Sequence, residues 1–124
     1  HALPVLVHAP GDDNWTDTTQ RYPNAPFIVA HACAWNGWEP APPVISLAGE
    51  IDNLYLDVAG SAAWRMALAR LVARTGVRKV LYGSDYPMFD LAFEIGRVAM
   101  ADLSDLEKLA IGGGNAARLF TRLT

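Results

Sequence analysis

Four short apolar segments are spread evenly along the chain, and each ends close to a histidine or an aspartate. The apolar segments are residues 3–7, 26–30, 53–58 and 79–83, and the polar residues are His8, His31, Asp57 and Asp85. The polar residues follow one another at intervals of 23, 26 and 28 residues. Such an interval holds one strand, one helix and their loops, which is the pattern of repeated βα units around a parallel sheet. The sequence therefore predicts an α/β fold with four parallel strands.

Three helices are indicated between and after these strands. Apolar residues recur at helical spacing over residues 64–75, and Gly76 stands where a glycine commonly ends a helix. Residues 90–100 form an amphipathic pattern. The sequence Ser-Asp-Leu-Glu at residues 104–107 is a capping box, which predicts the start of a further helix.

The remaining helices carry weaker signals. We predict a short helix over residues 15–22, with Asn14 as its N-cap. The prolines after the second strand leave room for only one or two helical turns, at residues 44–48. The glycines at residues 112–114 break the helix before them, and Asn115 is predicted to cap a last short helix.

Composition limits the classes of protein to which the chain can belong. Its 124 residues suffice for one domain with a core, and its net charge of −3 argues against binding to nucleic acid or an acidic membrane. Its single cysteine excludes an internal disulfide and fits the cytoplasm. No apolar run approaches the ~20 residues of a membrane span. Because the sequence begins at His1 within a strand-like segment, we expect a piece of a longer polypeptide.

The polar residues after the strands suggest a metal site. Since the carboxyl ends of parallel strands meet at one edge of the sheet, we expect His8, His31 and Asp85 to converge there. Imidazole and carboxylate groups suit a divalent metal such as zinc, and a carboxylate there can also transfer a proton. Gly83 is expected to leave room for Asp85. Asp57 is interpreted as a hydrogen-bond acceptor in a loop.

Each of these residues also has a structural interpretation. A histidine after a strand is commonly a hydrogen-bonded structural residue, and Asp85 is also a typical turn residue. Trp35 is predicted to line a substrate pocket, although an aromatic residue in a loop is as often part of ordinary packing.

Taken together, the motifs resemble the amidohydrolase-related family, which includes metal-dependent decarboxylases of the aminocarboxymuconate-semialdehyde type. The resemblance rests on His8 and His31 after their apolar segments, Gly-Ser-Asp-Tyr-Pro at residues 83–87 and Gly-Asn-Ala-Ala-Arg-Leu-Phe at residues 114–120. It implies a TIM-type (β/α)8 barrel in which the four strands are strands five to eight. By this resemblance His8 and Asp85 bind the metal, His31 helps to activate water or substrate, and Asp85 also transfers a proton.

The resemblance covers only the second half of that fold. The family's His-X-His pair on strand one is absent, as are strands one to four, and a complete barrel needs ~250 residues. We therefore expect residues 1–124 to form one domain that lacks its N-terminal half. Strand edges left open in this way require either that half or a homo-oligomer.

Three functions remain open at this point. The first is a metal-dependent hydrolase or nonoxidative decarboxylase that acts on a small carboxylic or aromatic acid. The second is a noncatalytic half-barrel with an incomplete metal site. The third is a flavodoxin-like α/β domain that binds a ligand, although a glycine-rich turn after the first strand is lacking.

Overall fold

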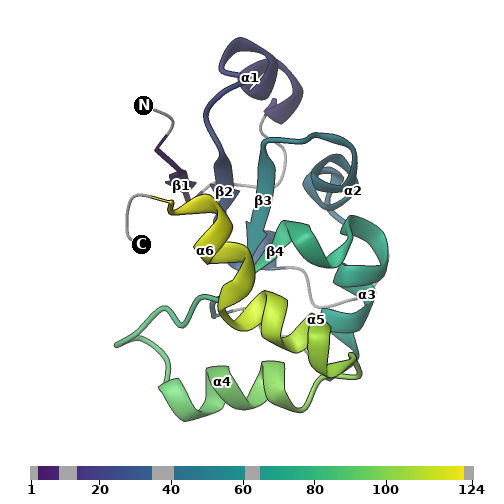
Figure 1. Ribbon diagram of the computed structural model, residues 1–124, viewed down its shortest axis with the longest axis vertical. Coiled ribbons are helices and arrows are strands. Elements are labelled where there is room, and N and C mark those ends of the chain that lie inside the picture. Colours follow the sequence, from purple (N-terminus) through teal and green to yellow (C-terminus); the bar gives the residue numbers. More distant parts are fainter. Residues whose placement is uncertain (1–2, 9–13, 35–40, 61–64, 122–124) are drawn as a thin grey trace.

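The computed structural model describes residues 3–8, 14–34, 41–60 and 65–121, and it contains one parallel sheet. The strands are β1 (Val5–Val7), β2 (Phe27–Val29), β3 (Leu54–Asp57) and β4 (Val80–Leu81). They lie in the order β1-β2-β3-β4, and each pairs in parallel with the next along the chain (Figure 1). The predicted α/β fold with parallel strands is confirmed. All four strands point the same way, so the segments that follow them share one edge of the sheet.

Helices connect and follow the strands. Their bounds are α1 (Trp15–Arg21), α2 (Pro43–Glu50), α3 (Arg65–Thr75), α4 (Leu91–Ala99), α5 (Asp105–Leu109) and α6 (Asn115–Leu119). Two 3-10 segments, η1 (Ala30–Ala34) and η2 (Val77–Lys79), flank strands β2 and β4, and a π segment, η3 (Ala110–Gly114), joins α5 to α6. None of the helices in the described residues has the length and hydropathy of a membrane-spanning segment.

Several helix ends form as the sequence predicts. The Asn14 side chain accepts a hydrogen bond from the Asp17 amide at 3.1 Å, and Gly76, at φ +80°, follows the last residue of α3. Ser104 and Glu107 form both bonds of the capping box at the start of α5. These contacts satisfy amide groups that have no partner within their own helix.

Two expectations about the C-terminal half are wrong. The predicted strand 79–83 shrinks to Val80–Leu81, because the Tyr82 amide bonds to the Ile111 carbonyl and leaves the sheet. Asn115 does not cap α6 but is its first residue. Its buried side chain instead donates to the carbonyls of Val77 and Val80, at 2.7 and 2.6 Å. Its Oδ1, the atom that would accept in an N-cap, accepts from Arg118 instead, so both polar atoms of the side chain are used elsewhere.

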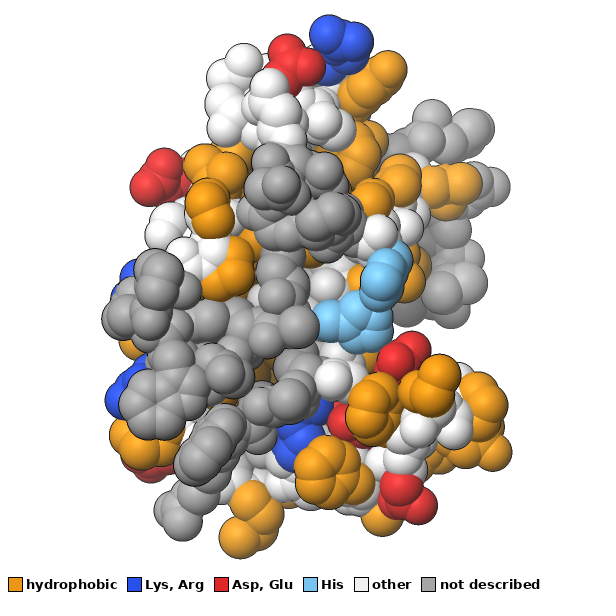
Figure 2. Space-filling view, turned by 180° about the vertical axis from the view of Figure 1, so that it is seen from behind, with side chains coloured by type: hydrophobic (Ala, Val, Ile, Leu, Met, Phe, Trp, Pro, Cys, Tyr) orange, Lys and Arg blue, Asp and Glu red, His pale blue; other side chains and the backbone are white. Residues whose placement is uncertain are grey.

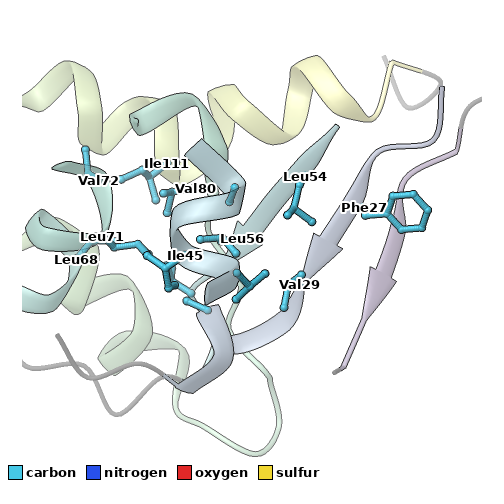
Figure 3. Packing of buried hydrophobic residues seen from close by; sticks show 14 of the residues in the cluster. Phe27, Val29, Ile45, Leu54, Leu56, Leu68, Leu71, Val72, Val80 and Ile111 are labelled. Carbon is cyan, nitrogen blue, oxygen red and sulfur yellow. The ribbon is translucent and has the colours of Figure 1, made fainter. Parts of the chain in front are cut away.

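The core lies between the sheet and the helices that pack against one of its faces. Alternate strand residues such as Val29, Leu54, Leu56 and Val80 point to this face, where they meet Ile45 of α2, side chains of α3 and Ile111 (Figure 3). Pro43 stands at the first turn of α2, where a proline is tolerated, so this helix extends beyond the predicted 44–48. The core anchors the strands and thereby fixes where their carboxyl ends lie.

The β1 edge of the sheet is open in the described part of the chain. Val5 is 42% exposed and Leu6 is 62% exposed, although both are strand residues. An apolar, unpaired strand edge in water is a liability that proteins normally cover with another strand or element. This edge is therefore a candidate surface for further structure.

Candidate functional site

Two histidines meet beyond the carboxyl ends of β1 and β2. His8 follows β1 directly, and His31 lies in the 3-10 segment η1 that follows β2. Their rings are in edge contact, with centroids 5.0 Å apart and an interplanar angle of 78°. Figure 2 shows the two side chains together at the surface. The parallel sheet thus joins two histidines that are 23 residues apart in sequence.

The ring of His31 is oriented by the backbone after β3. Its Nδ1 lies 2.8 Å from the carbonyl oxygen of Ala59. A carbonyl oxygen can only accept a hydrogen bond, so Nδ1 carries the proton when the ring is neutral. The lone pair then resides on Nε2, which is the nitrogen that can accept a proton or bind a metal.

Asp57, the last residue of β3, holds the same loop. Its Oδ1 accepts a hydrogen bond from the Ala59 amide at 2.6 Å and a longer one from the His31 amide at 3.4 Å. The interpretation of Asp57 as a loop hydrogen-bond acceptor is confirmed. Burial raises the pKa of Asp57 above its usual value; these two hydrogen bonds and His31 oppose the rise, and the charge of Asp85 adds to it.

Asp85 approaches this group from the segment after β4. Its carboxylate Oδ2 would lie 3.1 Å from a Cβ built on Gly60, and its charge influences Asp57. Asp85 is exposed, and its φ is +53°. Asp57 and Asp85 therefore bring two carboxylates to the edge of the sheet where the histidines lie.

The backbone around the site is strained at three residues that are not glycine. His31, Ala32 and Asp85 have φ values of +61°, +40° and +53°. Residues with a side chain rarely adopt this region, and each such conformation costs about 1–3 kcal/mol. Backbone strain of this kind concentrates at functional sites, where the surrounding structure maintains it.

The role predicted for Gly83 needs correction. A Cβ at this position would lie 2.4 Å from Oδ2 of Asp57 and 2.9 Å from the Cβ of Ala59. Gly83 therefore leaves room for Asp57, not for Asp85. The glycine beside Asp85 is Gly60, which also has a positive φ of +53°.

Sequence reasoning missed the importance of the Ala59 backbone, whose amide contacts Asp57 and whose carbonyl contacts His31. These contacts are made by backbone atoms, so the identity of the Ala59 side chain does not predict them. The adjacent Gly60 is the one residue in the sequence that points to an unusual backbone there. Trp35, predicted to line a substrate pocket, lies outside the described residues.

The side chains at this edge carry the types of ligand atom that a divalent metal binds, but too few of them lie together among the described residues to form a complete site. Imidazole nitrogen and carboxylate oxygen are suitable donors, and His31 presents Nε2 because Nδ1 is bonded to the backbone. Across the described segments of the chain, however, no three His, Cys, Asp or Glu side chains lie close enough together to hold an ion. A catalytic zinc site usually takes about three protein ligands. These residues alone thus offer part of a ligand set.

Comparison with known proteins identifies the family. The sequence model of the amidohydrolase family (Amidohydro_2) matches residues 1–122. The chain belongs to this family. The resemblance drawn from the strand-end motifs is thereby confirmed. No curated protein matches the chain.

Solved structures share the fold of this amidohydrolase chain at low sequence identity. One is the dihydroxybenzoic acid decarboxylase of Polaromonas sp. JS666, which was solved with manganese and the inhibitor 2-nitroresorcinol. Its sequence identity to this chain is 20% and its TM-score is 0.66, and the match covers 86% of this chain and 36% of that protein. For the 5-carboxyvanillate decarboxylase of Sphingomonas paucimobilis the identity is 18%, the TM-score 0.68 and the coverage 97% and 49%. For amidohydrolase 2 of Bifidobacterium longum subsp. infantis the identity is 18%, the TM-score 0.71 and the coverage 96% and 50%. The chain spans half or less of each of these proteins.

Proposed function

We propose that this chain supplies strands five to eight of a (β/α)8 barrel and that strands one to four come from outside it. The four parallel strands follow one another in sequence order, as consecutive barrel strands do. The apolar β1 edge is open, and the similar solved chains are at least about twice as long. Residues 1–124 then form one structural unit, completed by a longer polypeptide or by a second copy.

We further propose that the complete protein is a metal-dependent enzyme, either a hydrolase or a nonoxidative decarboxylase, that acts on a small carboxylic or aromatic acid. The observation that carries this proposal is the meeting of His8 and His31 at the edge of the sheet that Asp57 and Asp85 also reach. Two of the similar structures are decarboxylases of aromatic acids, which favours decarboxylation over hydrolysis.

In this proposal His8 and Asp85 hold the metal, and we take zinc as the expected ion, with manganese as the alternative found in a similar structure. A bound divalent ion would act as a Lewis acid toward an oxygen of the substrate. Either reaction also needs a group that moves one proton at the reacting atom. His31 suits this task through Nε2, because the Ala59 carbonyl holds its other nitrogen in the protonated form. Asp85 is the second proton-transfer group.

The metal content of two samples tests the proposal and separates it from a noncatalytic half-barrel. Purified chain and complete protein are dialysed with zinc or manganese, and bound metal is measured by mass spectrometry. We expect about one tightly bound ion per complete protein and much weaker binding by the chain alone, because its described residues form no three-ligand group. A complete protein that binds no metal would refute the enzymatic proposal.

Activity gives the second test. The complete protein is assayed for CO2 release from dihydroxybenzoate and 5-carboxyvanillate, and for hydrolysis of their esters. Asp85→Asn keeps the shape of the side chain but removes its charge, and loss of such proton transfer slows turnover by ~10²- to 10⁴-fold. Arg21→Met breaks only an exposed ion pair with Asp17 and serves as the control. Normal turnover of Asp85→Asn would make Asp85 a turn residue.

A further inference from the structure

A buried ion pair lies on helix α4, next to the backbone that follows β3. Glu94 Oε2 and Arg97 Nη1 are 2.5 Å apart, and their side chains are only 1% and 12% exposed. Removing two charges from water is costly, and replacing such a pair with apolar residues is often neutral or stabilising. The pair is also not optimised for stability, since the other oxygen of Glu94 and Nε of Arg97 have no hydrogen-bond partner in the described structure. It therefore calls for an explanation other than stability.

Arg97 reaches from α4 to the backbone that follows β3. Its Nη1 donates to the carbonyl oxygen of Val58 at 3.2 Å. The Val58 amide is in turn fixed by the Leu81 carbonyl of β4, at 3.1 Å. Val58 is thus held on both sides, through its amide by the sheet and through its carbonyl by Arg97.

The next residue along the chain is Ala59, which contacts two polar side chains of the site, Asp57 and His31. Its amide donates to Asp57 Oδ1 at 2.6 Å, and its carbonyl lies 2.8 Å from Nδ1 of His31. A continuous series of contacts therefore runs from Glu94 through Arg97 and residues 58–59 to His31. If the Val58 carbonyl loses its donor, the peptide that links Val58 to Ala59 keeps the bond from the Ala59 amide to Asp57, but the backbone that carries the Ala59 carbonyl is less firmly fixed.

We propose that Glu94 and Arg97 are positioning residues for His31: they fix the peptide segment 58–59 so that the Ala59 carbonyl keeps the His31 proton on Nδ1. The carboxylate of Glu94 holds the guanidinium of Arg97 in place, and Arg97 holds the backbone. The side chain of His31 then presents Nε2 for chemistry. Which hydrogen bond one imidazole nitrogen makes decides the state of the other, so control of the Ala59 carbonyl is control of Nε2.

This inference deepens the proposed function, but its test depends on neither metal nor substrate. The chain is labelled with ¹⁵N in its histidine rings, and the tautomer of His31 is read by NMR at a fixed pH of about 9, where an ordinary imidazole is neutral. A chelator is present, and His31→Gln identifies the signals by removing them. We expect wild-type His31 to carry its proton on Nδ1.

The variants separate positioning from a purely structural role. Arg97→Met and Glu94→Gln should shift His31 from a single tautomer to a mixture, while Arg97→Lys, which retains a cationic donor, should restore part of the preference. Arg21→Met removes an exposed ion pair on α1 and should leave the tautomer unchanged. Circular dichroism shows which variants are folded. Should Arg97→Met fail to fold, the milder Glu94→Gln and Arg97→Lys provide the comparison.

Two results would overturn the proposal. One is a wild-type His31 protonated on Nε2, since the Ala59 carbonyl would then not set the tautomer. The other is a folded Arg97→Met or Glu94→Gln variant in which His31 remains entirely in the Nδ1-protonated form. In the second case the ion pair only attaches α4 to the sheet. Because no turnover is measured, an inactive complete protein would refute the proposed function without affecting this inference.

Discussion

Adding one methyl group at Gly83 tests whether the carboxylate of Asp57 is fixed in its place. In Gly83→Ala the new Cβ would lie 2.4 Å from Oδ2 and 2.9 Å from Cγ of Asp57. The Cβ of Ala59 would also be 2.9 Å away. Contacts this short cannot persist, so either the surroundings are compressed or the carboxylate moves.

Both responses have a cost that can be estimated. Compression of a packed site typically costs about 1–3 kcal/mol. Movement of the carboxylate breaks its 2.6 Å bond from the Ala59 amide, and a hydrogen bond to a charged group contributes about 1.5–3 kcal/mol. The response with the lower free-energy cost will dominate. Alanine also lowers the conformational entropy of the unfolded chain, which stabilises the folded state by about 0.4–1 kcal/mol. We therefore expect Gly83→Ala to lower the free energy of unfolding by about 1.5 kcal/mol.

Gly96 provides a matched control within the same chain. It lies inside α4, and a Cβ there would have no atom within 4 Å. Gly96→Ala should therefore raise the free energy of unfolding by about 0.5–1 kcal/mol, so the same substitution has opposite signs at the two sites. Both values come from urea unfolding followed by circular dichroism.

A double variant identifies the cause of the Gly83 effect. In an Asp57→Ala background the carboxylate is gone and only the Ala59 contact remains. The cost of Gly83→Ala should then fall without vanishing. The reasoning is refuted if Gly83→Ala is as stable as wild type within about 0.5 kcal/mol, or if its cost is unchanged in the double variant.

The other predictions concern single side chains. The raised pKa of Asp57 means that the folded state binds the Asp57 proton more tightly than the unfolded state does. In metal-free buffer, the stability of wild type relative to Asp57→Asn should therefore fall as pH rises from the usual value of 3.8 through the higher folded pKa. A constant stability difference, measured by urea titrations at each pH, would contradict the raised pKa. Asn115→Ala should cost about 3 kcal/mol in thermal or urea unfolding, because the buried Val80 carbonyl and the partly buried Val77 carbonyl lose their donor. Asn53→Ala should cost less, because its three carbonyl contacts are partly buried or exposed. Ser104→Ala should cost about 1 kcal/mol by the same measurement through loss of the N-cap of α5, and an effect near zero would argue against the capping box.

Local sequence patterns predicted the elements whose signals are themselves local. The capping box at Ser104, the glycine that ends α3 and the N-cap of α1 depend on residues a few positions apart, and all three form. The parallel sheet could be predicted because the strand-end intervals describe chain length, and chain length limits how strands can be connected. By contrast, β4 is shorter than predicted because Tyr82 bonds to Ile111, 29 residues away.

In the candidate site, too, the sequence predicts some features and not those that depend on distant contacts. The sequence places His8 and His31 after equivalent strands, so their approach to one edge follows from the parallel arrangement. It does not reveal that the Ala59 carbonyl selects a nitrogen of His31, since this contact depends on the path of the backbone after β3. The role of Gly83 was assigned to the wrong aspartate for the same reason, because its nearest side chain comes from the neighbouring strand.

The positive φ values of Ala32 and Asp85 have a consequence for how this protein can evolve. Glycine adopts this backbone without strain, so a change to glycine at either position would relieve about 1–3 kcal/mol, from which the higher entropy of an unfolded chain with glycine subtracts about 0.4–1 kcal/mol. Selection for thermostability without a screen for activity would thus favour the loss of Asp85, while the apolar core would offer few gains of this kind. Under the role proposed for Asp85, a laboratory lineage made more stable in this way would lose its chemistry before its fold, and its first mutations would mark the residues that natural selection retains at a thermodynamic cost.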